Sequence, residues 1–168
     1  MIRCLEEKDR ENIVHLLRAT ESFNEAEISI AMELAGIILG QPAQTDYLGF
    51  VHEAVECGMS RITGLLIVGP TPATTGTWHL YWIAVDPEYY GTGVAQTLHS
   101  WAEALICGRG GYWLLAETSS QPGYARARAF YRQQQYAELA RIPDYYKPAD
   151  DMILYGKRLP LPIGEQGQ

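Results

Sequence analysis

The chain has 168 residues, of which 47% are hydrophobic and 20% are charged, and its formal net charge at pH 7 is −7. This composition is typical of a globular domain with a sizeable core, and the acidic balance without a basic run excludes binding to a nucleic-acid backbone. Since no apolar run could span a bilayer and no targeting segment precedes the first expected strand, we expect a cytoplasmic protein without a membrane partner.

The three cysteines argue against a disulfide framework and against a metal site. Cys4, Cys57 and Cys107 are odd in number and widely separated, and their spacing is not that of metal ligands. We therefore expect reduced thiols that are mostly buried, and no bound metal ion.

The first part of the chain has the pattern of a strand, two helices and two further strands. Asn24 has the residue type of an N-cap for the second helix, and Gly40 begins the segment that stops it. A turn that contains Gly58 joins the two strands, and the short spacing favours an antiparallel meander with the strand that follows. The expected elements are a strand at 2–5, helices at 8–18 and 25–39, and strands at 47–55 and 62–68.

The rest of the chain is arranged around a strand, a glycine turn and a helix at residues 78–105. From Trp78 to Val85 the residues are apolar, aromatic or β-branched almost throughout, and Pro87 ends the strand. The expected later elements are a strand at 112–118, a helix at 124–134, and strands at 136–142 and 152–157 on either side of a break at 143–148. We predict a single domain at 1–159 and a flexible tail at 160–168, which contains two prolines and two glycines.

The glycine turn is a candidate anion site. Gly91 and Gly93 stand directly before the helix, whose first backbone N–H groups and partial positive charge favour phosphate. A dinucleotide-binding fingerprint would need a third glycine where Gln96 stands, and a Walker A loop would need a lysine that this turn lacks. The turn therefore belongs to a different class of phosphate loop.

This turn resembles the coenzyme A pyrophosphate loop of the GNAT N-acetyltransferase superfamily. The family motif is Gln or Arg, two free positions, Gly, one free position, then Gly or Ala. Tyr90 departs from the usual first residue, and Thr92 stands where a basic residue is common. The resemblance implies that acetyl-CoA is the cosubstrate and that the motif binds its pyrophosphate through six residues: Tyr90, Gly91, Thr92, Gly93, Val94 and Ala95.

The order of the expected elements is similar to that of the same family. The resemblance implies an α/β fold (α+β) with a mixed, mostly antiparallel central sheet that is flanked by helices and has splayed central strands. In the family the gap between these strands admits the pantetheine arm. The implied backbone contacts are Ile83, Ala84 and Val85, and the Val85 N–H would face the thioester oxygen.

A second motif lies in the C-terminal half. Ala127 followed by Phe130-Tyr131 and then Tyr136 resembles the family's helix that ends in an aromatic pair, with Tyr124 where asparagine is often found. The resemblance implies that Tyr124 and Ala127 contact the cofactor and that Tyr131 is the general acid for the departing thiolate. A phenol with a pKa of about 10 donates a proton without being ionised at neutral pH. The alternative interpretation is an amphipathic tyrosine packed under the sheet.

The general base has two candidates. His79 falls where several family members carry a catalytic glutamate, and a histidine titrates near neutrality, as this task requires. Glu117, late in the following strand, is the rival. The alternatives are a structural hydrogen-bonding histidine, a carboxylate that caps the next turn, and a chain of ordered water that replaces a single base.

We therefore expect an N-acetyltransferase in which a primary amine of a small molecule or peptide attacks acetyl-CoA directly. The loops at 144–146 and 21–24 are candidates for the acceptor pocket. The alternative function is a non-catalytic acyl-CoA-binding or regulatory module of the same fold. Dimerisation is common in folds of this kind, but the sequence reveals no interface.

Overall fold

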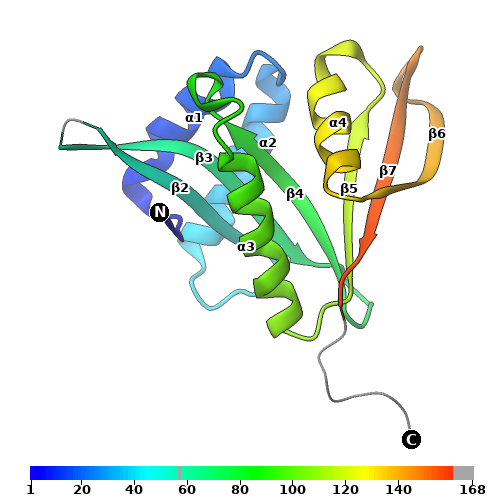
Figure 1. Ribbon diagram of the computed structural model, residues 1–168, viewed down its shortest axis with the longest axis horizontal. Helices are drawn as coiled ribbons and strands as arrows, with labels where there is room; N and C mark the ends of the chain where they lie inside the picture. The colour runs from blue at the N-terminus through cyan, green and yellow to red at the C-terminus, as the bar shows by residue number, and fades with distance from the viewer. Residues whose placement is uncertain (57, 161–168) are drawn as a thin grey trace, which may run out of the picture. The chain divides into compact units, whose positions relative to one another are not determined.

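The computed structural model describes residues 1–56 and 58–160, and its order of helices and strands is the order expected from the sequence (Figure 1). Three short 3₁₀ helices, η1 (Glu7–Asp9), η2 (Pro87–Tyr89) and η3 (Pro122–Tyr124), accompany the main elements. The main elements are β1 (Ile2–Cys4), α1 (Arg10–Ala19), α2 (Glu25–Gly40), β2 (Leu48–Glu56), β3 (Met59–Pro70), β4 (Thr77–Val85), α3 (Val94–Gly108), β5 (Trp113–Ser119), α4 (Ala125–Gln133), β6 (Ala137–Lys147) and β7 (Asp150–Arg158).

The strands form a mixed sheet in the order β1-β2-β3-β4-β5-β7-β6. The pairs β1–β2, β2–β3, β5–β7 and β6–β7 are antiparallel, whereas β4 and β5 pair in parallel, with His79 opposite Leu115. The predicted class, a mostly antiparallel sheet flanked by helices, is therefore confirmed. The chain groups into two compact units, Met1–Gly69 with Tyr81–Ala102, and Pro70–Leu80 with the remainder from Glu103.

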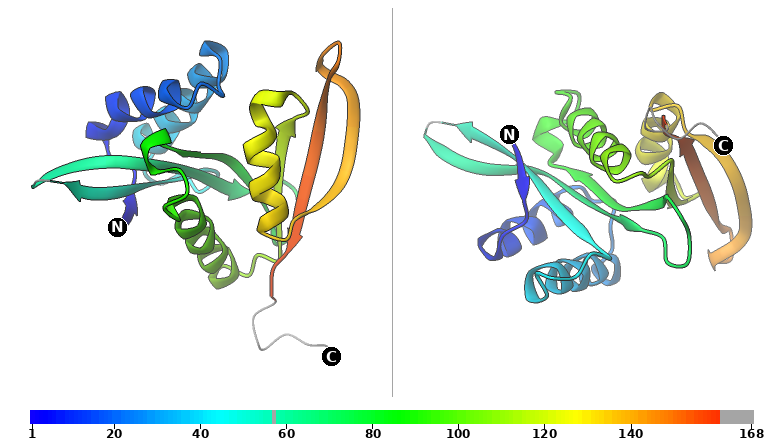
Figure 2. Two further views of the ribbon diagram at one scale, coloured as in Figure 1. Left: turned by 45° about the horizontal axis from the view of Figure 1, so that its top comes forward. Right: turned by 90° about the horizontal axis from the view of Figure 1, so that it is seen from below.

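In the first unit, helices cover both faces of the strands. The helices α1 and α2 lie on one face and the first turns of α3 lie on the other (Figure 2). The core under α1 and α2 includes the fully buried Ile13, Leu17 and Leu65. On the opposite face the rings of Phe50 and Trp101 are 4.0 Å apart. Successive strand residues point to opposite faces, and both faces are covered by helices. Apolar side chains therefore lie on both sides of this sheet.

A glycine in β3 sets how closely α3 approaches the sheet. A Cβ placed on Gly64 would lie 2.7 Å from Leu98 and 3.0 Å from Val94, two buried residues at the start of α3. Any larger residue at this position would push the helix away from the strand. The start of α3, and hence the turn before it, is therefore positioned by backbone-to-helix packing.

In the second unit, α4 packs against β5 and β7 (Figure 1). Three buried tyrosines form the contact: the ring centroid of Tyr131 on α4 lies 5.3 Å from that of Tyr136 and 5.4 Å from that of Tyr155 on β7. Aromatic rings at such separations contribute to stability beyond the area they bury. The position of α4 is therefore fixed through the residue expected to act as the general acid.

Two local predictions have clear outcomes. Asn24 caps α2 as expected: its side chain accepts from the Glu27 N–H at 3.0 Å, and the Glu27 carboxylate accepts from the Asn24 N–H at 2.8 Å. By contrast, the break expected at 143–148 is wrong, because β6 continues to Lys147. The order of strands places β6 at an edge, where Pro143 removes no ladder hydrogen bond that a neighbour needs.

The cysteine prediction needs correction. Cys4 is exposed and Cys107 is half-buried, and both are free thiols. Cys4 is the last residue of the three-residue strand β1, which lies at an edge of the sheet and has a neighbouring strand on one side. Cys57 and the tail beyond residue 160 lie outside the described residues. Within residues 1–56 and 58–160, no helix has the length and apolar character that a membrane span requires.

Candidate active site

The strand β4 leads into the glycine turn through a capped 3₁₀ turn. Asp86 accepts a hydrogen bond from the Glu88 N–H at 3.0 Å with one carboxylate oxygen, which caps η2. Its own N–H donates to the carbonyl of Thr63 on β3 at 3.0 Å. Pro87 occupies the first position of η2, where a missing N–H is tolerated. The end of β4 and the start of the turn are therefore both held by backbone hydrogen bonds.

The glycines of the turn adopt a conformation that other residues rarely adopt. Gly91 has φ = 78° and Gly93 has φ = 89°. Between them, Thr92 donates both its N–H and its hydroxyl to the carbonyl of Tyr89, at 3.2 and 2.7 Å. Apart from the glycine and its two chain neighbours, no atom of the described chain comes within 4 Å of a Cβ placed on Gly91 or Gly93. The two glycines therefore leave open space above the turn.

The first turn of α3 faces this space with backbone donors. The first hydrogen bond of the helix runs from the Thr97 N–H to the Gly93 carbonyl at 2.9 Å. The amides of Val94 and Ala95 precede this bond, so their N–H groups can only donate to acceptors outside the helix. Residues 94–97 contain no acidic side chain that would occupy the helix terminus. This donor set and the space above it fit a bound phosphate group.

The other implied cofactor contacts lie on both sides of this turn in the sequence. Ile83 is half-buried, and Ala84 and Val85 are buried, all at the end of β4. In the second unit, Tyr124 is the N-cap residue of α4 and Ala127 is half-buried in its first turn. Backbone groups are the implied contacts at 83–85, so burial of these side chains is compatible with the expected role.

The structure brings the two rival bases together. His79 Nε2 lies 3.5 Å from Oε1 of Glu117, and the His79 side chain is 16% exposed while that of Glu117 is 42% exposed. The parallel pairing places His79 opposite Leu115, two residues before Glu117, so both side chains reach the same part of the two strands. Burial lowers the pKa of His79 below its ordinary value of 6.5, and the negative charge of Glu117 partly opposes this shift. The lowered pKa favours the neutral imidazole, which is the form that is able to accept a proton.

Tyr131 is enclosed by aromatic rings. It is 5% exposed, and its neighbours include Phe130 in addition to Tyr136 and Tyr155. Burial raises the pKa of the Tyr131 phenol above its ordinary value, and Tyr155 adds to the shift. The hydroxyl stays protonated at every physiological pH, so it is available as a proton donor and not as a base.

A polar network that the sequence did not reveal holds the turn between β5 and α4. Arg128 donates to the carbonyls of Ser119 and Gln121 at 2.7 and 2.8 Å. The Ser119 hydroxyl donates to the buried carboxylate of Asp150 at the start of β7. These bonds join the end of the strand that carries Glu117 to the helix that carries Tyr131. No local sequence signal marks them, because the partners are distant in the chain.

Of the residues expected at the acceptor pocket, 144–146 are exposed, whereas Ser22 and Phe23 are half-buried. The segment 144–146 belongs to β6 and is not a loop, and the rings of Tyr145 and Tyr146 meet edge to face with centroids 5.0 Å apart. Asp144 has φ = 53° and accepts from the Ala149 N–H at 2.6 Å, which marks a bulge in this edge strand. The segment 21–24 does connect α1 to α2, as expected.

The family model of an acetyltransferase (GNAT) domain matches residues 47–138 of this chain. Among solved structures, a GNAT-family acetyltransferase candidate from Desulfovibrio desulfuricans has 31% sequence identity and a TM-score of 0.86, with 94% of this chain and 98% of that chain covered. A comparison with curated proteins finds no match.

Two more distant structures have the same fold. The ribosomal-protein-S18-alanine N-acetyltransferase from Escherichia coli has 20% identity and a TM-score of 0.73, with 100% of this chain and 99% of that chain covered. An aminoglycoside 6′-N-acetyltransferase complexed with coenzyme A has 16% identity and a TM-score of 0.71, with 96% and 99% covered. At these identities the likeness concerns the fold alone.

Proposed function

Since the chain belongs to the GNAT family of acetyltransferases, we propose that it is an N-acetyltransferase in which a primary amine attacks acetyl-CoA directly. The observation that carries this proposal is the turn before α3, where Gly91 and Gly93 have positive φ and the first helical amides face open space. The acceptor is an amine of a small molecule or peptide, and the proposed catalytic domain comprises residues 1–159.

The residues that would hold acetyl-CoA follow from their backbone groups. The turn from Tyr90 to Ala95 would bind the pyrophosphate through its N–H groups, and backbone groups of Ile83, Ala84 and Val85 would pair with the pantetheine arm. Tyr124 and Ala127 would complete the contacts from α4. When bound, acetyl-CoA supplies an acetyl thioester, which is an activated acyl donor with a thiolate leaving group.

We assign the removal of the amine proton to the pair of His79 and Glu117. An alkyl amine with a pKa of about 10 is protonated at neutral pH and must lose a proton to become a nucleophile. A proton on His79 Nε2, which faces Glu117, leaves the lone pair of the neutral ring on Nδ1. The imidazole then accepts the amine proton, and the carboxylate of Glu117 stabilises the imidazolium that results.

We assign the other proton transfer to Tyr131. Its phenol donates a proton to the thiolate as the bond between the acetyl carbon and sulfur breaks, and it recovers a proton from solvent after product release. The assignment rests on the match of Phe130-Tyr131 to the family's helix, since burial raises the pKa of Tyr131, which keeps the phenol protonated but makes it a weaker acid. Starting from the ammonium, the nitrogen loses two protons, one to His79 before the attack and one as the tetrahedral intermediate becomes the amide. The thiolate gains one proton from Tyr131, so one proton is released to solvent overall.

A thiol-release assay with an amine panel tests the proposal. The panel combines an aminoglycoside, a peptide with N-terminal alanine and a simple polyamine, because the neighbouring structures are named for amines of the first two kinds. Calorimetry with coenzyme A accompanies it. Binding with turnover of at least one amine supports the N-acetyltransferase. Binding with no turnover of any amine would favour the non-catalytic module, and absence of binding would contradict both.

A further inference from the structure

Arg61 on β3 makes three contacts with the turn that precedes the glycines. Its guanidinium lies 2.7 Å from a carboxylate oxygen of Asp86 and 2.6 Å from one of Glu88, and its Cζ lies 5.5 Å from the centre of the Tyr89 ring. A planar guanidinium suits such a task, because it donates in two directions and packs on an aromatic face. One side chain from β3 therefore contacts the N-cap residue of η2 and two residues of η2 itself.

These contacts continue by hydrogen bonds into the glycine turn. The second oxygen of Asp86 caps η2, and the carbonyl of Tyr89 accepts both the N–H and the hydroxyl of Thr92. Gly93 and the first amides of α3 follow directly. The path from Arg61 to the donors of the anion site thus consists of short contacts within one compact unit.

The charges in this path matter for an anion. Asp86 and Glu88 carry two negative charges a few residues before the amides that would bind pyrophosphate, and the Asp86 side chain is only 8% exposed. Like charges at such range oppose binding, and an arginine in contact with both carboxylates cancels much of that repulsion. The turn itself has no basic residue, since Tyr90 and Thr92 occupy the positions where the family pattern has one.

We propose that Arg61 is a positioning residue for the pyrophosphate of coenzyme A: it holds η2 and neutralises Asp86 and Glu88, so that the glycine turn accepts a doubly charged group. This inference rests on the proposed function, because it assumes that coenzyme A binds at this turn. Arg61 does not touch the cosubstrate. It supplies, from a neighbouring strand, the positive charge that the turn does not carry.

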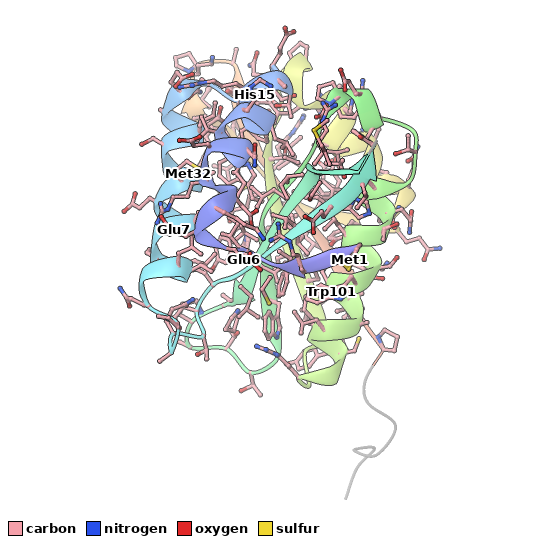
Figure 3. All side chains as sticks on the ribbon, turned by 90° about the vertical axis from the view of Figure 1, so that its left-hand side faces the viewer. Met1, Glu6, Glu7, His15, Met32 and Trp101 are labelled. Atoms are coloured by element: carbon pink, nitrogen blue, oxygen red, sulfur yellow. The ribbon has the colours of Figure 1, made fainter. Side chains whose placement is uncertain are left out.

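The surroundings of Arg61 allow the residue to be replaced without a packing defect. A cavity of about 100 Å³ lies beside it, and its lining includes the polar side chains of Asn12, Ser60 and His15 as well as the apolar Leu16 and Ile62 (Figure 3 labels His15 on α1). The Arg61 side chain is itself 40% exposed. Water can therefore solvate a shortened side chain here, and we expect Arg61→Met to fold.

The test compares Arg61→Met, Arg61→Lys and a control, Arg10→Met. Arg10 forms an ion pair with Glu7, with 2.5 Å between Nε and Oε1, and makes no contact with Asp86 or Glu88 among the ion pairs of the described residues. For Arg61→Met we expect the Kd of coenzyme A, from calorimetry, to rise about tenfold at low salt, and the difference from wild type to shrink as salt screens the carboxylates. Arg61→Lys should retain part of the affinity, because lysine keeps the positive charge but lacks the planar guanidinium that donates to both carboxylates. Arg10→Met changes nothing.

A second substrate separates positioning from general damage. S-acetylpantetheine has no phosphate, so its KM should be the same in wild type and in Arg61→Met, whereas the KM of acetyl-CoA should rise without loss of kcat. The inference is overturned if folded Arg61→Met binds coenzyme A within twofold of wild type, or if the KM of S-acetylpantetheine rises equally. Wild-type protein that does not bind coenzyme A would overturn the proposed function as well.

Discussion

The glycine turn before α3 and the side chains of the proposed acid and base meet different requirements. The turn presents backbone N–H groups, and its conformation depends on two glycines with positive φ and on contacts from outside it. The group of His79, Glu117 and Tyr131 instead presents side chains, whose protonation depends on burial and on neighbouring charge. Apart from the two glycines, side-chain identity within the turn is therefore replaceable, whereas it is decisive in the second region.

This difference explains why the departures from the family motif are compatible with the proposed function. Tyr90 and Thr92 change side chains that the backbone donors do not need, and Arg61 pairs with the two acidic residues that precede the turn. By contrast, Tyr131 has no such substitute, since a ring without a hydroxyl would pack equally well but donate no proton. Substitutions in the two regions should therefore differ in size and in the kinetic parameter that they change.

The largest expected effect is that of Tyr131→Phe. We expect kcat to fall by roughly 10²-fold or more, the usual scale for one positioned acid, while the Kd of coenzyme A stays unchanged. The matched control is Tyr155→Phe, because the buried hydroxyl of Tyr155 makes no hydrogen bond to any described residue and its ring lies 5.4 Å from Tyr131. Steady-state kinetics with chemistry rate-limiting provide the measurement. Equal losses in the two variants would assign the effect to the loss of a buried hydroxyl in this cluster and not to proton donation.

Next in size is the effect of His79→Gln. A protonated imidazole cannot accept a proton, so kcat/KM should fall as the pH drops through the pKa of His79, which burial holds below 6.5. His79→Gln should remove this dependence and lower kcat/KM by about 10- to 10³-fold. Glu117→Gln should move the midpoint to lower pH, since the carboxylate is the group that raises the pKa of His79.

The same pH profiles identify the base if it is not His79. With Glu117 as the base, the acidic fall in kcat/KM survives in His79→Gln and is lost in Glu117→Gln. If neither substitution alters the profile, ordered water carries the proton, and the midpoint follows the pKa of the substrate amine across a series of acceptors. Either result would contradict the assignment of His79 as the general base.

A smaller effect is expected from Gly93→Val, in affinity and not in kcat. At φ = 89° a β-branched residue is strained by roughly 1–3 kcal/mol, and its methyl groups occupy the space above the turn. We expect the Kd of coenzyme A to rise at least about tenfold, by calorimetry on folded protein. Gly108→Val, at the end of the same helix and without positive φ, is the control. Unchanged affinity in Gly93→Val would remove the turn from the site.

The smallest expected effect is a gain from Thr92→Lys. An exposed lysine restores the basic residue common in the family, and an exposed charge contributes about 0–1 kcal/mol, so the Kd of coenzyme A should fall about two- to fivefold at low salt. The gain should vanish at high ionic strength. A much larger gain would mean that side-chain charge, and not the backbone, dominates binding at this turn.

Much of the fold could be predicted from the sequence because the signals are local. Apolar periodicity, the Asn24 cap and the glycines of the turn each depend on residues within one or two turns of backbone, and the structure confirms the order of elements that they predicted. The exposure of Cys4 and the length of β6 were mispredicted, since both depend on which strand lies at an edge of the sheet. No local pattern reports strand order.

By itself, then, the sequence determined the elements, the family and the candidate residues, because backbone conformation and the glycine motif depend on residues that are close together in the chain. Only the tertiary structure decided how candidates combine: His79 and Glu117 are partners at 3.5 Å, although the sequence presented them as rivals. It also decided that Arg61, from another strand, pairs with Asp86 and Glu88. Charge and burial act through space, so residues far apart in the chain determine each other's protonation and ion pairing.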